Sequence, residues 1–252
     1  MNPSTTPTSS DTVRRLFLAG TTVLAPVVLL LSAALAVDDP DTDGRAHLDA
    51  VAGDRDQLFT SNALAALGLA MLAIAASGVV LLARRRGGAL ATAGWILTTI
   101  GGISAASAVF LYGAVIHAVT DSRLDRDAMG ALDSQASNSG RIGIAFVVGF
   151  LGLALGLLLL AAGLWRARTV PLWMAGLLGL AAVLLVFSDT DETWQQVLLV
   201  SPLLVLVGLG VEIARGDRTI VLPGTPDDAS TITDHDRADG QGHGRGLLHR
   251  SR

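Results

Sequence analysis

The sequence contains no cysteine and no lysine, and aromatic residues make up only 4% of its 252 residues. Without cysteine there is no disulfide bridge, no thiol nucleophile and no iron–sulfur or cysteine-bound zinc site. All 18 basic residues are arginine, and the formal net charge is −4. This charge balance gives no support for nucleic-acid binding, because such proteins carry a basic surface.

Catalytic motifs are missing as well. The chain has no H-E-x-x-H zinc-protease motif, no G-x-S-x-G nucleophile elbow and no phosphate-binding P-loop. None of its long apolar segments carries a central aspartate or glutamate, which argues against proton- or sodium-coupled transport and against intramembrane aspartyl proteolysis. We therefore predict that the protein is not an enzyme and holds no cofactor.

Long hydrophobic segments are what the sequence does contain. Hydrophobic residues make up 51% of the chain, and the mean hydropathy is +0.54. The charged residues cluster between apolar segments of the length that crosses a bilayer. The pattern predicts an all-α fold, a polytopic transmembrane helical bundle with six spans at residues 16–37, 59–83, 89–119, 142–165, 170–187 and 197–214.

The arginines predict the orientation of these spans. With six spans, one side receives nine arginines, and the opposite loops hold Arg45, Arg55, Arg123, Arg126 and Arg141 together with many aspartates. The nine are Arg14, Arg15, Arg84, Arg85, Arg86, Arg166, Arg168, Arg215 and Arg218. Since the arginine-rich side is normally cytoplasmic, we expect both termini inside the cell and the aspartate-rich loops outside.

The ends of the chain differ from its middle. Residues 1–12 are rich in Ser, Thr and Pro, and residues 222–252 are polar, so we expect two disordered cytoplasmic segments flanking a membrane domain at 13–221. An alternative concerns the first span. Arg14-Arg15 followed by an apolar stretch and Ala34-Leu35-Ala36 also fits a cleaved export signal, which would leave five spans.

One motif in the first outer loop has the form of a calcium site. Asp39, Asp41 and Asp43 alternate and are followed by Gly44, as in the D-x-D-x-D-G start of an EF-hand-like loop. The twelfth position of such a loop is Ala50 instead of a bidentate glutamate. The hexapeptide therefore predicts either a weak calcium site or an ordinary acidic turn.

Two residues that can carry a charge near neutral pH fall inside the predicted spans. His117 lies near the outer end of the third span, where it is either a ligand or proton-carrying group or an interfacial residue in reach of water. Glu212 lies three residues before Arg215, and this spacing favours an ion pair at the cytoplasmic interface over a buried proton carrier.

The segment Gly163-Leu-Trp-Arg-Ala-Arg-Thr-Val-Pro-Leu-Trp173, within the six-span plan, resembles the small six-span integral membrane proteins found in GC-rich Gram-positive bacteria. The resemblance implies a multi-pass protein of a bacterial cytoplasmic membrane, with the lipid bilayer as its main partner and no activity to carry over. A non-enzymatic structural or accessory role is our first hypothesis. The alternatives are a passive transporter or channel for a small uncharged or amphipathic molecule, and an extracytoplasmic calcium sensor. A protein partner or a homo-oligomer is compatible with each.

Overall fold

The computed structural model describes residues 9–37, 44–83, 87–121, 125–137, 140–187 and 201–215, and all of them belong to one unit, Met1–Arg215. Every secondary-structure element among them is a helix. The elements in chain order are α1 (Ser9–Ala34), α2 (Gly44–Val51), α3 (Arg55–Ala83), α4 (Gly88–Val119), α5 (Arg126–Ser137), α6 (Gly140–Ala167), α7 (Leu172–Phe187), the 3-10 turn η1 (Ser201–Leu204) and α9 (Val205–Arg215).

Four of these helices are long and apolar enough to cross a membrane. The membrane-compatible segments are Thr12–Ala34, Arg55–Ala83, Gly88–Val119 and Phe146–Ala167, each of 22 to 32 residues. A helix rises about 1.5 Å per residue, so each segment matches or exceeds the ~30 Å thickness of a hydrocarbon core. They coincide with the first four predicted spans, which the structure confirms as long apolar helices.

The last two predicted spans take a different form. The apolar part of α7, Leu172–Leu185, is shorter than a typical span. The predicted sixth span contains the turn η1 and the 11-residue helix α9, and its first four residues lie outside the described part of the chain. Proline has no N–H to donate inside a helix, so Pro202 in η1 is consistent with a 3-10 turn ahead of the regular helix.

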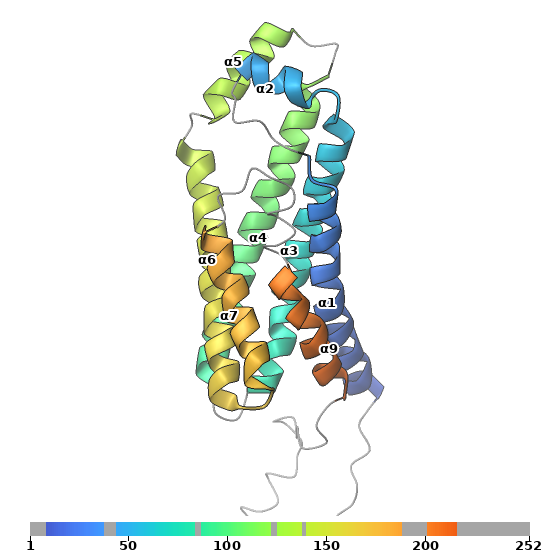
Figure 1. Ribbon diagram of the computed structural model, residues 1–252, viewed down its shortest axis with the longest axis vertical. Helices are drawn as coiled ribbons and strands as arrows, with labels where there is room; N and C mark the ends of the chain where they lie inside the picture. The colour runs from blue at the N-terminus through green and yellow to red at the C-terminus, as the bar shows by residue number, and fades with distance from the viewer. Residues whose placement is uncertain are drawn as a thin grey trace, which may run out of the picture. The chain divides into compact units, whose positions relative to one another are not determined.

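The long helices pack side by side in a chain of neighbours (Figure 1). Helix α3 packs against α1 and α4, α4 packs against α6, α6 packs against α7, and α9 packs against α1. The short helices α2 and α5 pack against each other at one end of the bundle. At the other end lie the start of α1 and the end of α9 (Figure 1).

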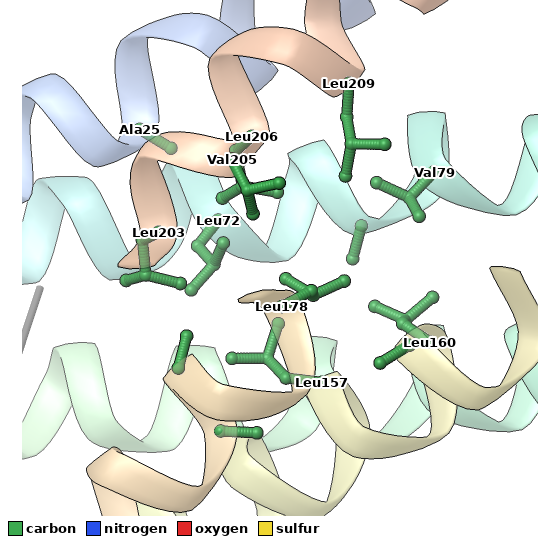
Figure 2. Close-up of a cluster of buried hydrophobic side chains, with 14 of the residues drawn as sticks. Ala25, Leu72, Val79, Leu157, Leu160, Leu178, Leu203, Val205, Leu206 and Leu209 are labelled. Atoms are coloured by element: carbon green, nitrogen blue, oxygen red, sulfur yellow. The ribbon is translucent and has the colours of Figure 1, made fainter. Parts of the chain in front are cut away.

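Aliphatic side chains fill the space between the helices. Figure 2 shows Leu72 and Val79 of α3, Leu157 and Leu160 of α6, and Leu178 of α7 turned toward one another, with Leu206 and Leu209 of α9 beside them. These side chains are at most 1% exposed, apart from Leu206 at 2%. The outward faces are also apolar, and Ile100, Leu111 and Val147 are among the exposed large residues. Since soluble proteins rarely expose apolar surface on this scale, the outer faces fit a lipid environment.

Glycine brings α4 and α6 into backbone contact. A Cβ added at Gly94 of α4 would lie 2.7 Å from the backbone nitrogen of Leu160, and one added at Gly149 of α6 would lie 2.9 Å from that of Ala105. Added Cβ atoms at Gly101 and Gly156 would overlap the facing backbone. Small residues allow this approach between membrane helices. Gly152 and Gly156, which lie four positions apart on α6, therefore pack within the chain, against α4.

Charged side chains divide between the two ends. The end with the start of α1 carries Arg14, Arg15, Arg166, Arg168 and Arg215, as the sequence predicts for a shared side. Among the residues that the structure describes, the opposite end carries Arg45, Arg55 and Arg126 with seven aspartates, which are Asp49, Asp54, Asp56, Asp121, Asp125, Asp127 and Asp133. Glu212 Oε1 lies 3.1 Å from Arg215 Nη1, which confirms the predicted ion pair.

Candidate functional site: a helical cap at the acidic end

The acidic end is covered by two short helices, at positions where the sequence predicts loops. We call α2 and α5 together the helical cap. Its helices lie in different connections of the chain, because α2 joins α1 to α3 and α5 joins α4 to α6. The cap therefore links two helix pairs that are far apart in sequence.

The two cap helices approach most closely at glycines. Gly44 begins α2 with a φ of +64°, a left-handed conformation that glycine adopts at little cost. A Cβ added there would lie 2.5 Å from Ser134 Oγ of α5, and one added at Gly130 of α5 would lie 2.8 Å from the backbone nitrogen of Arg45. Both the backbone conformation and the close approach thus require a residue without a side chain.

A buried histidine–aspartate pair joins the cap helices. His47 Nδ1 lies 3.0 Å from Asp133 Oδ2, and the side chains are 6% and 7% exposed. A carboxylate can only accept, so the ring N–H donates to it. The backbone N–H of Gly44 donates to the same oxygen at 3.0 Å. Asp133 thus binds both a side chain and the first turn of α2, where the orphan N–H groups of a helix need acceptors.

Exposed ion pairs surround this buried contact. Arg45 of α2 pairs with Asp127 of α5, and Arg126 of α5 pairs with Asp49 of α2 at 2.9 Å. Arg45 also lies 3.6 Å from Asp49, which joins the pairs into one network. The hydrogen bond from Arg45 to Asp127, with the negative charges of Asp127 and Asp49, raises the pKa of Arg45 above its ordinary value. Arg45 therefore stays charged at any physiological pH.

An apolar cluster lies beneath α2. Leu48 and Val51 of α2 are at most 1% exposed and pack with Leu58 of α3 and with Ile116 and Val119 of α4. Val37, Tyr112 and Met129 pack against this cluster from its margin. The cap is consequently held in two ways: α2 packs on the ends of α3 and α4, and it also pairs with α5.

The second histidine–aspartate pair lies at the same end but is open to solvent. His117 Nε2 is 3.0 Å from Asp56 Oδ1, with side chains 40% and 83% exposed. The His117 ring also contacts Phe59, with ring centroids 5.3 Å apart. The structure thus places His117 at the end of α4, where its ring contacts Asp56 and Phe59 of α3. Its role as a ligand or proton-carrying group stays a prediction.

The predicted calcium loop lies outside the described residues, which resume at Gly44 immediately after Asp39, Asp41 and Asp43. Among the described residues, no group of three or more histidine or acidic side chains is arranged to hold a metal ion. The calcium hypothesis therefore still rests on the sequence pattern.

Sequence reasoning missed His47 and Asp133, the buried polar core of the cap. The signal for α2 was short: its buried residues Gly44, His47, Leu48 and Val51 follow helical spacing over only two turns. Among the residues of α5 whose burial is described, Gly130 and Asp133 are the buried positions, and neither has an apolar side chain. A hydrophobicity pattern alone does not detect a helix whose buried face is glycine and aspartate.

The geometry of the described residues defines an α-helical protein with several helices able to cross a membrane and a polar two-helix cap at one end. Comparison with protein-family models, curated proteins and solved structures finds no match.

Proposed function

We propose that this protein is a six-span protein of a bacterial cytoplasmic membrane, with both termini inside, that serves a non-enzymatic structural or accessory role through its extracytoplasmic helical cap. The arginine end faces the cytoplasm in this arrangement, following the positive-inside rule. The cap then faces the exterior, where it meets other proteins or a second copy of the chain.

One observation carries the proposal. In the described residues, aliphatic side chains fill the interior of the bundle, and the charged side chains lie near the helix ends. Transporters and intramembrane enzymes place polar or ionisable groups at membrane depth, where such groups are costly. A bundle packed in this way supports a rigid membrane anchor, with its polar chemistry concentrated in the cap.

The transporter alternative has one feature to consider. The hydroxyls of Thr98 and Thr99, in the middle of α4, are buried without a hydrogen-bond partner. However, Thr98 lies at a close approach of α4 to α6, since a Cβ added at Gly156 would overlap its hydroxyl and its backbone nitrogen. This crowding favours helix packing over a path for solute, so we rank passive transport below the accessory role.

Because the chain has no cysteine, single cysteines can report its orientation cleanly. Ala46→Cys in α2 and Ala131→Cys in α5 place thiols at exposed positions of the cap, and Thr169→Cys places one at the opposite end. We expect a membrane-impermeant maleimide to label the two cap variants in intact cells, and Thr169→Cys only after lysis. The reverse pattern would overturn the proposed orientation.

The role itself is tested with purified protein. In mild detergent, native mass spectra should show a homo-oligomer or a stoichiometric protein partner, and proteoliposomes should show no added flux of water, glycerol or urea. A bare monomer that conducts any of these solutes would replace the accessory role with passive transport.

A further inference from the structure

The buried carboxylate of the cap has a charge that needs compensation. Asp133 is 8% exposed and receives two hydrogen bonds at Oδ2, from the Gly44 N–H and from the His47 ring. A buried carboxylate facing only neutral donors is costly, whereas a buried ion pair with good hydrogen bonds offsets much of that cost. The ring of His47, at 3.0 Å, is positioned to supply the positive charge.

Several other charged groups around the cap have partners of their own. The cap arginines, Arg45 and Arg126, are held by exposed aspartates, Asp127 and Asp49. Beneath the cap, α3 and α4 bring further titratable or charged groups to this end, namely Asp54, Arg55, Asp56, Tyr112, His117 and Asp121. Asp56 is paired with His117 and lies 3.7 Å from Arg55. Imidazole is the side chain whose charge ordinarily changes between pH 5 and 8.

We propose that the His47–Asp133 pair is a proton-sensitive latch that holds α2 against α5. When the His47 ring takes up a proton from solvent, its hydrogen bond to Asp133 becomes a salt bridge, the buried pair becomes neutral overall and the cap tightens. When the ring loses that proton, the carboxylate keeps two neutral donors and the cap loosens.

Opening this latch has consequences beyond the cap. Because α2 lies between α1 and α3, and α5 lies between α4 and α6, the latch ties the two connections together. Separation of α2 from α5 would expose the carboxylate of Asp133 and the facing sides of the two helices, while Leu48 and Val51 keep α2 packed on α3 and α4. The latch thus controls which surface the cap presents. Its biological setting rests on the proposed placement of the cap outside the membrane, but its chemistry does not.

The test is hydrogen exchange on the full-length protein in lipid nanodiscs at pH 5.5 and pH 7.5, with every rate corrected for intrinsic exchange. We expect the backbone amides of α2 and α5 to be about tenfold better protected at pH 5.5. This lies within the upper limit of about a hundredfold over two pH units, because one titrating group changes the opening equilibrium by at most tenfold per pH unit. The protection of α3 and α4 at mid-span should not change. Equal or weaker cap protection at pH 5.5 would overturn the latch.

Three variants identify the group responsible. His47→Gln keeps a hydrogen-bond donor without a titrating charge and should abolish the pH dependence of cap protection. Asp133→Asn removes the carboxylate and should abolish it too, which keeps the test decisive if one variant loses the cap altogether. His117→Gln is the control. It removes the exposed His117–Asp56 pair, which has the same 3.0 Å distance, and should leave the pH dependence of cap protection unchanged.

Persistence of the pH effect in His47→Gln or Asp133→Asn, or its loss in His117→Gln, would contradict the assignment. Hydrogen exchange tests the latch, whereas maleimide labelling and solute flux test the proposed function. Failure of one proposal can therefore be distinguished from failure of the other.

Discussion

The contact between α4 and α6 and the contact between α2 and α5 show two ways of joining helices in one chain. In the first, glycines let two long backbones touch, and van der Waals packing supplies the stabilisation. In the second, two short helices are joined by a buried His–Asp pair and a network of exposed ion pairs. The difference follows the surroundings of each contact. Lipid contains no water to hydrate charged groups, whereas water reaches the end of the bundle. We expect the first contact to depend on shape and the second on charge.

The largest effect should come from filling the α4–α6 contact. Gly101→Leu places a side chain where even a Cβ overlaps the backbone of α6, and we expect a loss of about 3 kcal/mol or more in the free energy of unfolding. Thermal unfolding in detergent measures it. The matched control is Gly176→Leu on α7, because an added Cβ there meets nothing within 4 Å. If both variants unfold alike, the contact does not depend on shape.

An intermediate effect should come from the buried pair of the cap. Asp133→Ala removes the acceptor of both the Gly44 N–H and the His47 ring, and we expect cap opening to become easier by about 2–3 kcal/mol. Hydrogen exchange of the α2 amides measures this free energy. Asp56→Ala breaks the exposed pair of equal length and should cost less than about 0.5 kcal/mol. Equal costs for the two variants would show that burial is not what distinguishes them.

The smallest effect should come from the exposed ion pairs. Arg126→Gln removes the 2.9 Å contact with Asp49, whose side chain is 54% exposed. We expect cap opening to change by about 0.5 kcal/mol at low salt and by less at 1 M salt, because solvent and ions screen exposed charges. Hydrogen exchange at both salt concentrations tests this. A larger effect that persists at 1 M salt would show that the exposed ion pairs stabilise the cap as strongly as the buried His47–Asp133 pair.

Much of the bundle was predictable from the sequence, and most of the cap was not. The helices that contain residues 59–83 and 89–119 follow from long apolar segments bounded by charges, and the structure extends them by only a few residues. The Glu212–Arg215 pair followed from its spacing on one helix. The cap escaped prediction for two reasons. The helical spacing of α2 spans only eight residues, and the buried positions described in α5 are Gly130 and Asp133, which give no apolar period.

Length and hydropathy by themselves determined that this chain is helical and able to cross a membrane, because a segment in lipid must satisfy its own backbone hydrogen bonds. They also determined that charged residues lie at helix ends. Only the tertiary structure decided which ends meet. His47 and Asp133 are 86 positions apart, and Gly44 and Asp133 are 89 apart. Their pairing depends on how α3 and α4 return the chain to the same end, and that return is a property of helix packing that no local pattern encodes.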